Sequence, residues 1–299
     1  MRGAESWMIG YLVNSLWMVP VVFATAWMAA RAVRRIGPHA EHRVWVATLL
    51  MEALLPALQI RLADVWRVLG ALKFWRWGLR NDGGDSNITV VTGAGRVHQA
   101  LQLPQWMVAG IAAVYACCVL YFAVRLGWGL WKTRRMQREA EPAELTDVVA
   151  NRWTQQSRSA GVEAAVLVSA MTHGPATVGI WRRALVIPPE FFTGMGESEL
   201  DAVMAHESAH MRRHDFTKNI FYSVAALPVA YHPLLWMTSS RLKESREMVC
   251  DAIAAEAVAG RERYARSLLR LASMLVENEP VRTIHAIGIF DVNTWRGEL

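Results

Sequence analysis

The stretch Ser198–Arg213, SELDAVMAHESAHMRR, decides how this chain of 299 residues is interpreted. It has a capping-box start, which predicts a helix, and it contains His206, Glu207 and His210 in the pattern H-E-x-x-H. Residues four apart share one face of a helix, so both imidazoles can bind one ion, and zinc suits imidazole nitrogen. Glu207 is one position further on, where it misses the metal and can accept a proton from water. The stretch therefore predicts a zinc-binding helix, with one Zn²⁺ per chain.

A catalytic zinc site needs a third protein ligand and one open position. His214 is on the same face as His210 but one turn further along the axis, which makes it awkward for closing the site. Glu247 and Asp251 are four residues apart on a separate predicted helix, where the first can bind the metal and the second can brace a ligand histidine. A solvated charge is the alternative for Glu247. The candidates still open at this point are His214, Asp215, Glu244, Glu247, Cys250 and Asp251.

The composition favours a membrane protein, since 53% of the residues are hydrophobic and 14 are Trp. Three apolar runs predict spanning helices at about 7–30, 44–60 and 105–124. The first is too long for a signal peptide and reads as an uncleaved anchor. Arginine clusters at 31–43 and 125–138 mark the cytoplasmic side, and residues 61–103 are the expected extracytoplasmic loop. The transmembrane region therefore covers 1–130.

The net charge of +6 suits either a membrane surface or nucleic acid. A basic nucleic-acid-binding regulator would use residues 125–138, but those charges directly follow a membrane run and no recognition-helix pattern comes after them. No direct nucleic-acid binding is therefore expected. The three cysteines form no disulfide framework.

Residues 131–299 predict a small α+β domain. Helices are expected at 145–160, 198–210, 240–258 and 261–277, and strands at 164–169 and 177–187. Four aromatic residues of this region are expected in its core: Trp153, Trp181, Phe191 and Phe192.

The apolar segment 219–240 has the hydropathy of a spanning helix but contains Pro228 and Pro233. A full crossing would put His210 and Glu247 on opposite sides of the bilayer, although both are candidates for one metal. We therefore expect this segment to be re-entrant, interfacial or buried, with its break at the prolines.

Several motifs together resemble the peptidase domain of the BlaR/MecR-type β-lactam sensor-transducers. They are HESAH at 206–210, HD at 214–215, YHPLLW at 231–236, REMVCD at 246–251, HRVW at 42–45, and Pro175 and Gly179 leading to VIP at 186–188. The similarity covers roughly residues 30–295. Its zinc-site part is shared with other membrane gluzincins, and the flanking motifs are more specific.

The resemblance implies a mostly α integral membrane protein with a small gluzincin-type metallopeptidase domain. Glu247 would be the third zinc ligand, Glu207 the general base, and Asp251 and Asp215 would brace the ligand histidines. The protein would be a multi-pass protein of a bacterial-type inner membrane with its peptidase domain in the cytoplasm. Its substrate would be itself or another protein, such as a transcriptional repressor. The strand ending at Ile187 would be an exposed edge that aligns substrate, or else an ordinary hairpin.

One departure concerns the sensor. The β-lactam sensors carry an extracytoplasmic penicillin-binding domain after the peptidase, and this sequence has no room for it before Leu299. The expected function is a membrane-embedded zinc endopeptidase acting in signalling, without implied β-lactam sensing. The alternative is a catalytically inactive signalling or scaffold protein that keeps the fold.

Overall fold

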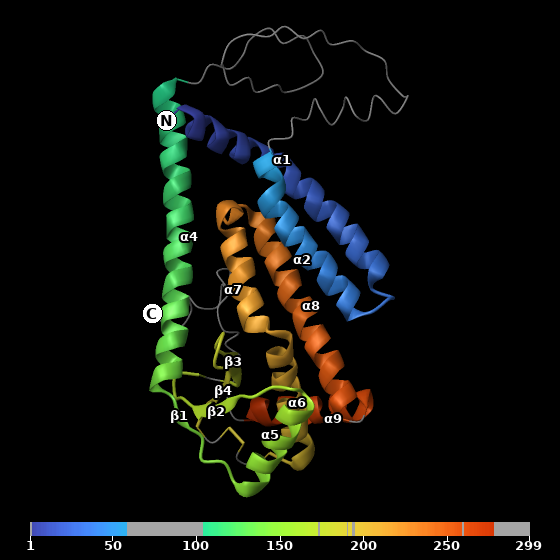
Figure 1. Cartoon of the computed structure of the whole chain (residues 1–299). Helices are drawn as coiled ribbons and strands as arrows, with labels where there is room; N and C mark the ends of the chain where they lie inside the picture. The colour runs from blue at the N-terminus through green and yellow to red at the C-terminus, as the bar shows by residue number, and fades with distance from the viewer. Residues whose placement is uncertain are drawn as a thin grey trace.

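A computed structural model shows a mostly helical chain with one small sheet (Figure 1). The structure describes residues 2–58, 104–172, 174–189, 191–192, 195–258 and 260–277. The loop expected at 61–103 lies outside the described residues.

Three long helices dominate the N-terminal half: α1 (Arg2–Val33), α2 (Pro38–Leu54) and α4 (Gln105–Glu139). A 3₁₀ turn, η1 (Leu55–Leu58), extends α2. By length and composition, Trp7–Val33 and Gln105–Glu139 could each cross a membrane. α2 is shorter, and its buried residues include Glu41 and Glu52. α4 continues unbroken past residue 130, so the boundary expected there falls inside a helix.

The segment after the H-E-x-x-H helix forms an antiparallel helical hairpin. It consists of α7 (Asp215–Ala226), the turn η2 (Leu227–Val229) and α8 (Pro233–Ala257) (Figure 1). Pro228 lies inside the turn, and Pro233 occupies the first turn of α8, where a missing N–H costs nothing. The chain therefore reverses within the apolar segment, and both ends of the hairpin lie on the same side of it.

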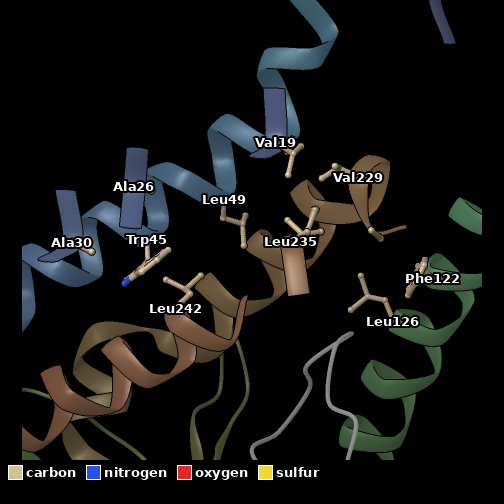
Figure 2. Packing of buried hydrophobic residues seen from close by; sticks show 13 residues of the cluster. Val19, Ala26, Ala30, Trp45, Leu49, Phe122, Leu126, Val229, Leu235 and Leu242 are labelled. Atoms are coloured by element: carbon tan, nitrogen blue, oxygen red, sulfur yellow. The ribbon is translucent and has the colours of Figure 1, made fainter. Parts of the chain in front are cut away.

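A buried apolar cluster joins the hairpin to the long helices (Figure 2). Trp45 and Leu49 of α2 face Leu235 and Leu242 of α8, and all four side chains are buried. Small residues allow the backbones to approach closely where α1 and the hairpin turn join the cluster. These are Ala26, Ala30, Ala226 and Ala230.

The sheet has four short strands, β1 (Glu141–Pro142), β2 (Ala165–Val168), β3 (Ala176–Val178) and β4 (Ala184–Ile187). Their order is β1-β2-β4-β3, with β4 parallel to β2 and antiparallel to β3. The single strand expected at 177–187 is therefore wrong. Gly179 has a φ of 97°, a turn conformation, so the segment is a hairpin.

Helices cover both faces of this sheet. On one face, Leu185 and Ile187 pack against Trp153 of α5 (Asp147–Ser159) and Met204 of α6 (Glu197–Arg213). The other face packs on the end of α4 and the start of α7. A last helix, α9 (Arg261–Glu277), contacts α6 and α8. As a result β4 is buried throughout, while β3 lies at the edge of the sheet.

Candidate metal centre

The two histidines of the motif face each other on α6. Their Nε2 atoms are 3.1 Å apart, which follows from the i, i+4 spacing. The α8 residue Glu247 approaches the same point, with its Oε2 3.6 Å from His206 Nε2 and 3.3 Å from His210 Nε2. Three ligand atoms from two helices thus form a small triangle.

This triangle has the dimensions of a zinc site. Zinc–ligand bonds of about 2.0–2.1 Å at tetrahedral angles place ligand atoms about 3.3–3.4 Å apart. The three edges of 3.1, 3.3 and 3.6 Å lie around this value. Arg246 Nε donates to the other Glu247 oxygen at 3.1 Å, which leaves Oε2 directed at the histidines. The donor set of two imidazoles and one carboxylate therefore fits zinc.

His206 is braced from its far side. Its Nδ1 lies 3.0 Å from Asp251 Oδ1 and 3.1 Å from the hydroxyl of Tyr264, which itself donates to Asp251 at 2.8 Å. A carboxylate at Nδ1 holds the proton there and leaves the Nε2 lone pair for a metal. The Asp251–Tyr264 pair therefore fixes both the tautomer and the ring orientation of His206.

His210 is braced in the same way by a different residue. Its Nδ1 lies 2.9 Å from Asp215 Oδ2, and Arg213 Nε donates to both Asp215 oxygens at 3.1 Å. His214 makes this possible, because its left-handed conformation (φ 59°) ends α6 and turns the chain into α7. Asp215 is thereby returned to the ring two residues after the helix ends.

A second group of possible ligands, His210, Asp215 and Cys250, lies behind the first. The Cys250 sulfur is 3.3 Å from Asp215 Oδ2 and 3.4 Å from His210 Nδ1. The Arg213 guanidinium on Asp215 disfavours a cation at this point, and His210 Nδ1 is already hydrogen-bonded. The group is therefore better suited to bracing His210 than to holding an ion of its own.

The charges around the ligands favour a cation. Burial lowers the pKa of His206, but its hydrogen bonds to Asp251 and Glu247 outweigh this and raise the pKa to about 9. Burial also lowers the pKa of His210, but its hydrogen bonds to Asp215, Cys250 and Glu247 outweigh this effect and raise the pKa well above its usual value. Burial raises the pKa of Glu247, and the two imidazoles hold it well below its usual range. The carboxylates therefore draw positive charge to this point, as protons or as a metal.

Glu207 lies beside the triangle and is not part of it. Its carboxylate is almost fully buried, and its Oε2 accepts a 3.0 Å hydrogen bond from Thr177 Oγ1 of the edge strand β3. The neighbour of the first ligand histidine is thus anchored to the sheet, while the histidines are anchored to other helices.

Comparison with known proteins agrees with this arrangement. The sequence model of a family described as BlaR1 peptidase M56 matches residues 8–287. The chain belongs to this family. Membership implies a metallopeptidase, and the resemblance stated from the motifs is confirmed.

Curated relatives of this M56 chain are more distant. It is 22% identical over 128 residues to the methicillin resistance mecR1 proteins of Staphylococcus aureus and Staphylococcus epidermidis, which covers 42% of this chain and 22% of each relative. It is 28% identical over 83 residues to the regulatory protein BlaR1 of Bacillus licheniformis, covering 28% of this chain and 14% of the relative. The matches thus span about a fifth or less of these relatives.

The M56 structure brings together all six site residues selected from the sequence: His206, Glu207, His210, Glu247, Asp251 and Asp215. Two other candidates for the third ligand lie elsewhere. His214 is exposed beside Arg183, and Glu244 is exposed and paired with Arg241.

Some expectations for the M56 sheet are wrong. The strand ending at Ile187 is central and not an edge, because β3 folds back onto it, so the second alternative, an ordinary hairpin packed on the helix, is the one that holds. Trp181, expected in the core, is 95% exposed at the tip of the β3–β4 hairpin. Trp153 is buried as expected, and Phe191 and Phe192 are partly buried against the same cluster.

Four site residues were given no role from the sequence: Thr177, Arg213, Arg246 and Tyr264. Arg246 directly precedes Glu247, and that adjacency was a usable signal. Thr177 and Tyr264 belong to no pattern with the H-E-x-x-H helix, since they reach it through tertiary packing from β3 and α9.

Proposed function

We propose that this chain is a membrane-embedded, zinc-dependent endopeptidase that cleaves a regulatory protein in transmembrane signalling. The observation that carries the proposal is the triangle of His206, His210 and Glu247 with the Glu207 carboxylate beside it. It combines three candidate protein ligands with a carboxylate on the neighbouring helical position, which is the residue set of a catalytic zinc site and its base.

His206, His210 and Glu247 would hold the zinc ion. A bound zinc ion would polarise the scissile carbonyl and lower the pKa of a water molecule towards about 7. Glu207 is the base that accepts the proton from the attacking water and passes it to the leaving amine. Asp251 and Asp215 keep the imidazole lone pairs directed at the metal, and Arg246 fixes the free oxygen of Glu247.

The edge strand β3 is the proposed substrate guide. An extended peptide can pair with an exposed strand edge and be held by main-chain hydrogen bonds. Thr177 of β3 also contacts the base, so a peptide on this edge would pass close to Glu207. The exposed Trp181, four residues further on, offers an aromatic contact at the end of that edge.

The proposed membrane arrangement rests on the helices and the basic residues. α1 and α4 have the length and apolarity to span, and α2 with η1 is proposed to cross beside α1. Arginines follow the end of α1 and occupy the last turns of α4, which puts these ends on the cytoplasmic side. The α7–α8 hairpin would enter the apolar layer from that side without crossing it. The metal centre, at the open end of the hairpin, would then face the cytoplasm.

The proposed substrate is a cytosolic or membrane regulatory protein, such as a repressor, or the chain itself. The names of these relatives refer to regulation and methicillin resistance, which supports a signalling role. No β-lactam input is part of this proposal.

The first test is zinc content of the purified full chain in detergent. We expect one zinc per chain in wild type and a sharp loss in His210→Ala and Glu247→Ala. Glu244→Ala is the matched control, because it removes an exposed carboxylate from the same helix. A folded wild type without zinc would refute the peptidase and favour the inactive scaffold. Retention of zinc by Glu247→Ala would refute its role as third ligand.

The second test concerns activity. Glu207→Gln should keep its zinc and bind substrate, while cleavage falls by about 10²–10⁴-fold, as for loss of a general base. Substrates captured by this variant in membranes of the source cell should be cut by wild type. Zinc-loaded wild type that cuts none of the captured proteins would support the scaffold alternative.

A further inference from the structure

His42 of α2 lies at the junction between the long helices and the metal centre. Its Nδ1 is 3.1 Å from Ser245 Oγ on α8, and its Nε2 is 3.1 Å from a terminal nitrogen of Arg213 at the end of α6. One side chain thus contacts both of the helices that carry the metal ligands.

The hydrogen-bond chemistry defines the state of this ring. A guanidinium has donors only, so His42 Nε2 must accept from Arg213 and the ring is neutral. Its Nδ1–H then donates to Ser245 Oγ, whose own hydroxyl donates to the Leu242 carbonyl at 2.9 Å. Every donor has an acceptor, so the arrangement selects one tautomer and one ring orientation.

Both contacts of His42 lead to a ligand. Arg213 holds Asp215, which is hydrogen-bonded to His210. Ser245 is buried on α8, two residues before Glu247. The ring therefore connects α2 to two of the three proposed zinc ligands. It reaches His210 through the Arg213–Asp215 pair at the junction of α6 and α7, and Glu247 through the backbone of one helical turn on α8.

A second polar contact ties the same helices together further from the site. Thr238 Oγ1 of α8 donates to the fully buried Glu52 of α2 at 2.9 Å. Between the two contacts the interface includes the buried apolar side chains of Trp45 and Leu49. Two directional contacts flanking an apolar interface fix the register of α2 on α8, which apolar packing alone would specify less sharply.

We propose that His42 is a positioning residue that fixes the metal centre to α2, so that a displacement of α2 alters the placement of His210 and Glu247. The inference rests on the proposed zinc peptidase function, and it assigns α2 as the element that regulates the peptidase. The regulating signal would be a movement of α2, which the neutral His42 ring would transmit to the metal centre.

The test uses the full chain loaded with Co²⁺ in place of zinc, because the visible spectrum of Co²⁺ depends on ligand geometry. His42→Phe fills the same space without hydrogen bonds. We expect it to shift the Co²⁺ bands and to weaken zinc binding about tenfold, the lower end of what outer-shell changes produce. His42→Gln, whose amide oxygen can still accept from Arg213, should restore part of the affinity.

Two control variants separate a positioning effect of His42 on the metal centre from a general loss of packing around α2. His39→Phe changes an exposed histidine of the same helix, and Leu49→Ala weakens the α2–α8 packing without touching a polar contact. Both should leave the Co²⁺ spectrum unchanged, although Leu49→Ala lowers the melting temperature. If His42→Phe does not fold, Ser245→Ala and His42→Gln carry the comparison.

An unchanged spectrum in the His42 variants, or an equal change in Leu49→Ala, would overturn the inference while leaving the peptidase proposal intact. A folded wild type that binds neither Co²⁺ nor zinc would overturn the peptidase proposal, and this inference with it.

Discussion

Thr177 and Glu207 are joined by a 3.0 Å hydrogen bond that links the edge of the sheet to the residue following His206. The bond connects two parts of the proposed mechanism, because the strand that would align the peptide also holds the base. Glu207 is buried, and the hydrogen bond from Thr177 holds one of its carboxylate oxygens.

Thr177→Val should lower kcat about tenfold with little change in KM. A hydrogen bond to a charged group contributes about 1.5–3 kcal/mol, and its loss leaves the carboxylate less well oriented. Thr177→Ser keeps the hydroxyl and should keep most of the rate. Steady-state kinetics on a captured substrate measure both. Equal kcat values for wild type and Thr177→Val would show that this contact does not orient the base.

Asp251→Asn and Asp215→Asn should each weaken zinc binding by about 10–100-fold, because each aspartate braces one ligand imidazole. Chelator competition gives the dissociation constants. Glu244→Gln, an exposed carboxylate change, is the control and should bind zinc like wild type. Each of the three variants removes one negative charge. If all three bound zinc with the same dissociation constant, net charge alone would explain the loss and the bracing roles would be contradicted.

The metal-free protein should become less stable as pH rises from about 6.5 to about 9. The pKa of His206 is raised to about 9 in the folded chain, above an ordinary value of about 6.5. Its stabilising contribution is therefore complete below pH 6.5 and is lost as pH rises through the folded value. Melting curves in excess chelator measure this, and His206→Ala should flatten the dependence. A wild-type curve as flat as that of the variant would rule out the raised pKa.

Zinc binding should have the opposite pH dependence. The ion displaces the Nε2 proton of each protonated imidazole, while the Nδ1 proton stays beside Asp251 or Asp215, so affinity should rise with pH over the same interval. Calorimetry in buffers of different ionisation enthalpy counts the protons released. At pH 7 we expect release from both His206 and His210, whose pKa values are both raised. Zinc uptake without proton release would contradict this.

Gly179→Ala should destabilise the protein by more than about 1 kcal/mol. Gly179 has a φ of 97°, and an added Cβ would lie 2.0 Å from the Arg182 carbonyl oxygen. Gly174→Ala is the matched control, since its Cβ would meet nothing within 4 Å and its φ is not positive. Thermal melting of the two variants measures the difference. Equal melting temperatures would show that the β3–β4 turn tolerates rearrangement.

Trp181→Ala should raise KM about tenfold or more without changing the melting temperature. The side chain is 95% exposed, so its removal costs the fold little, while an exposed aromatic residue beside a binding edge is a typical binding hot spot. An increase in KM is the diagnostic result. A drop in melting temperature with an unchanged KM would assign Trp181 to structure.

Much of the candidate site could be predicted because it is encoded locally. The i, i+4 spacing of His206 and His210 and that of Glu247 and Asp251 are properties of single helices, and α6, α8 and α9 are present. The mostly helical architecture and the family are confirmed. If one ion joins α6 and α8, the chain must reverse between these helices, and it turns at Leu227–Val229.

The parts of the sheet and the site that could not be predicted depend on which strands pair and which helices pack together, and the local sequence pattern does not contain this information. The segment 177–187 has a continuous β-type composition, and only the φ of Gly179 divides it into two strands. Once β3 folds back, β4 becomes central and the edge passes to β3, which also leaves Trp181 at the exposed turn. Tyr264 reaches His206 from α9 through packing across helices. Strand order and helix packing of this kind are tertiary properties.

In the proposed arrangement, the continuous helix α4 would set the distance from the bilayer at which a peptide is cut. Its 35 residues extend about 52 Å at 1.5 Å per residue, while a hydrocarbon core is about 30 Å thick. In the proposed arrangement roughly 20 Å projects into the cytoplasm as a stalk, and Gln137 near its end donates to the Arg182 carbonyl of the β3–β4 hairpin at 3.2 Å. Under this proposal the projecting part of α4 would hold the β3–β4 hairpin, and the metal centre beside it, at a fixed distance from the membrane surface. A soluble substrate would then have to approach that surface, and a membrane-anchored substrate would have to present its scissile bond within that distance.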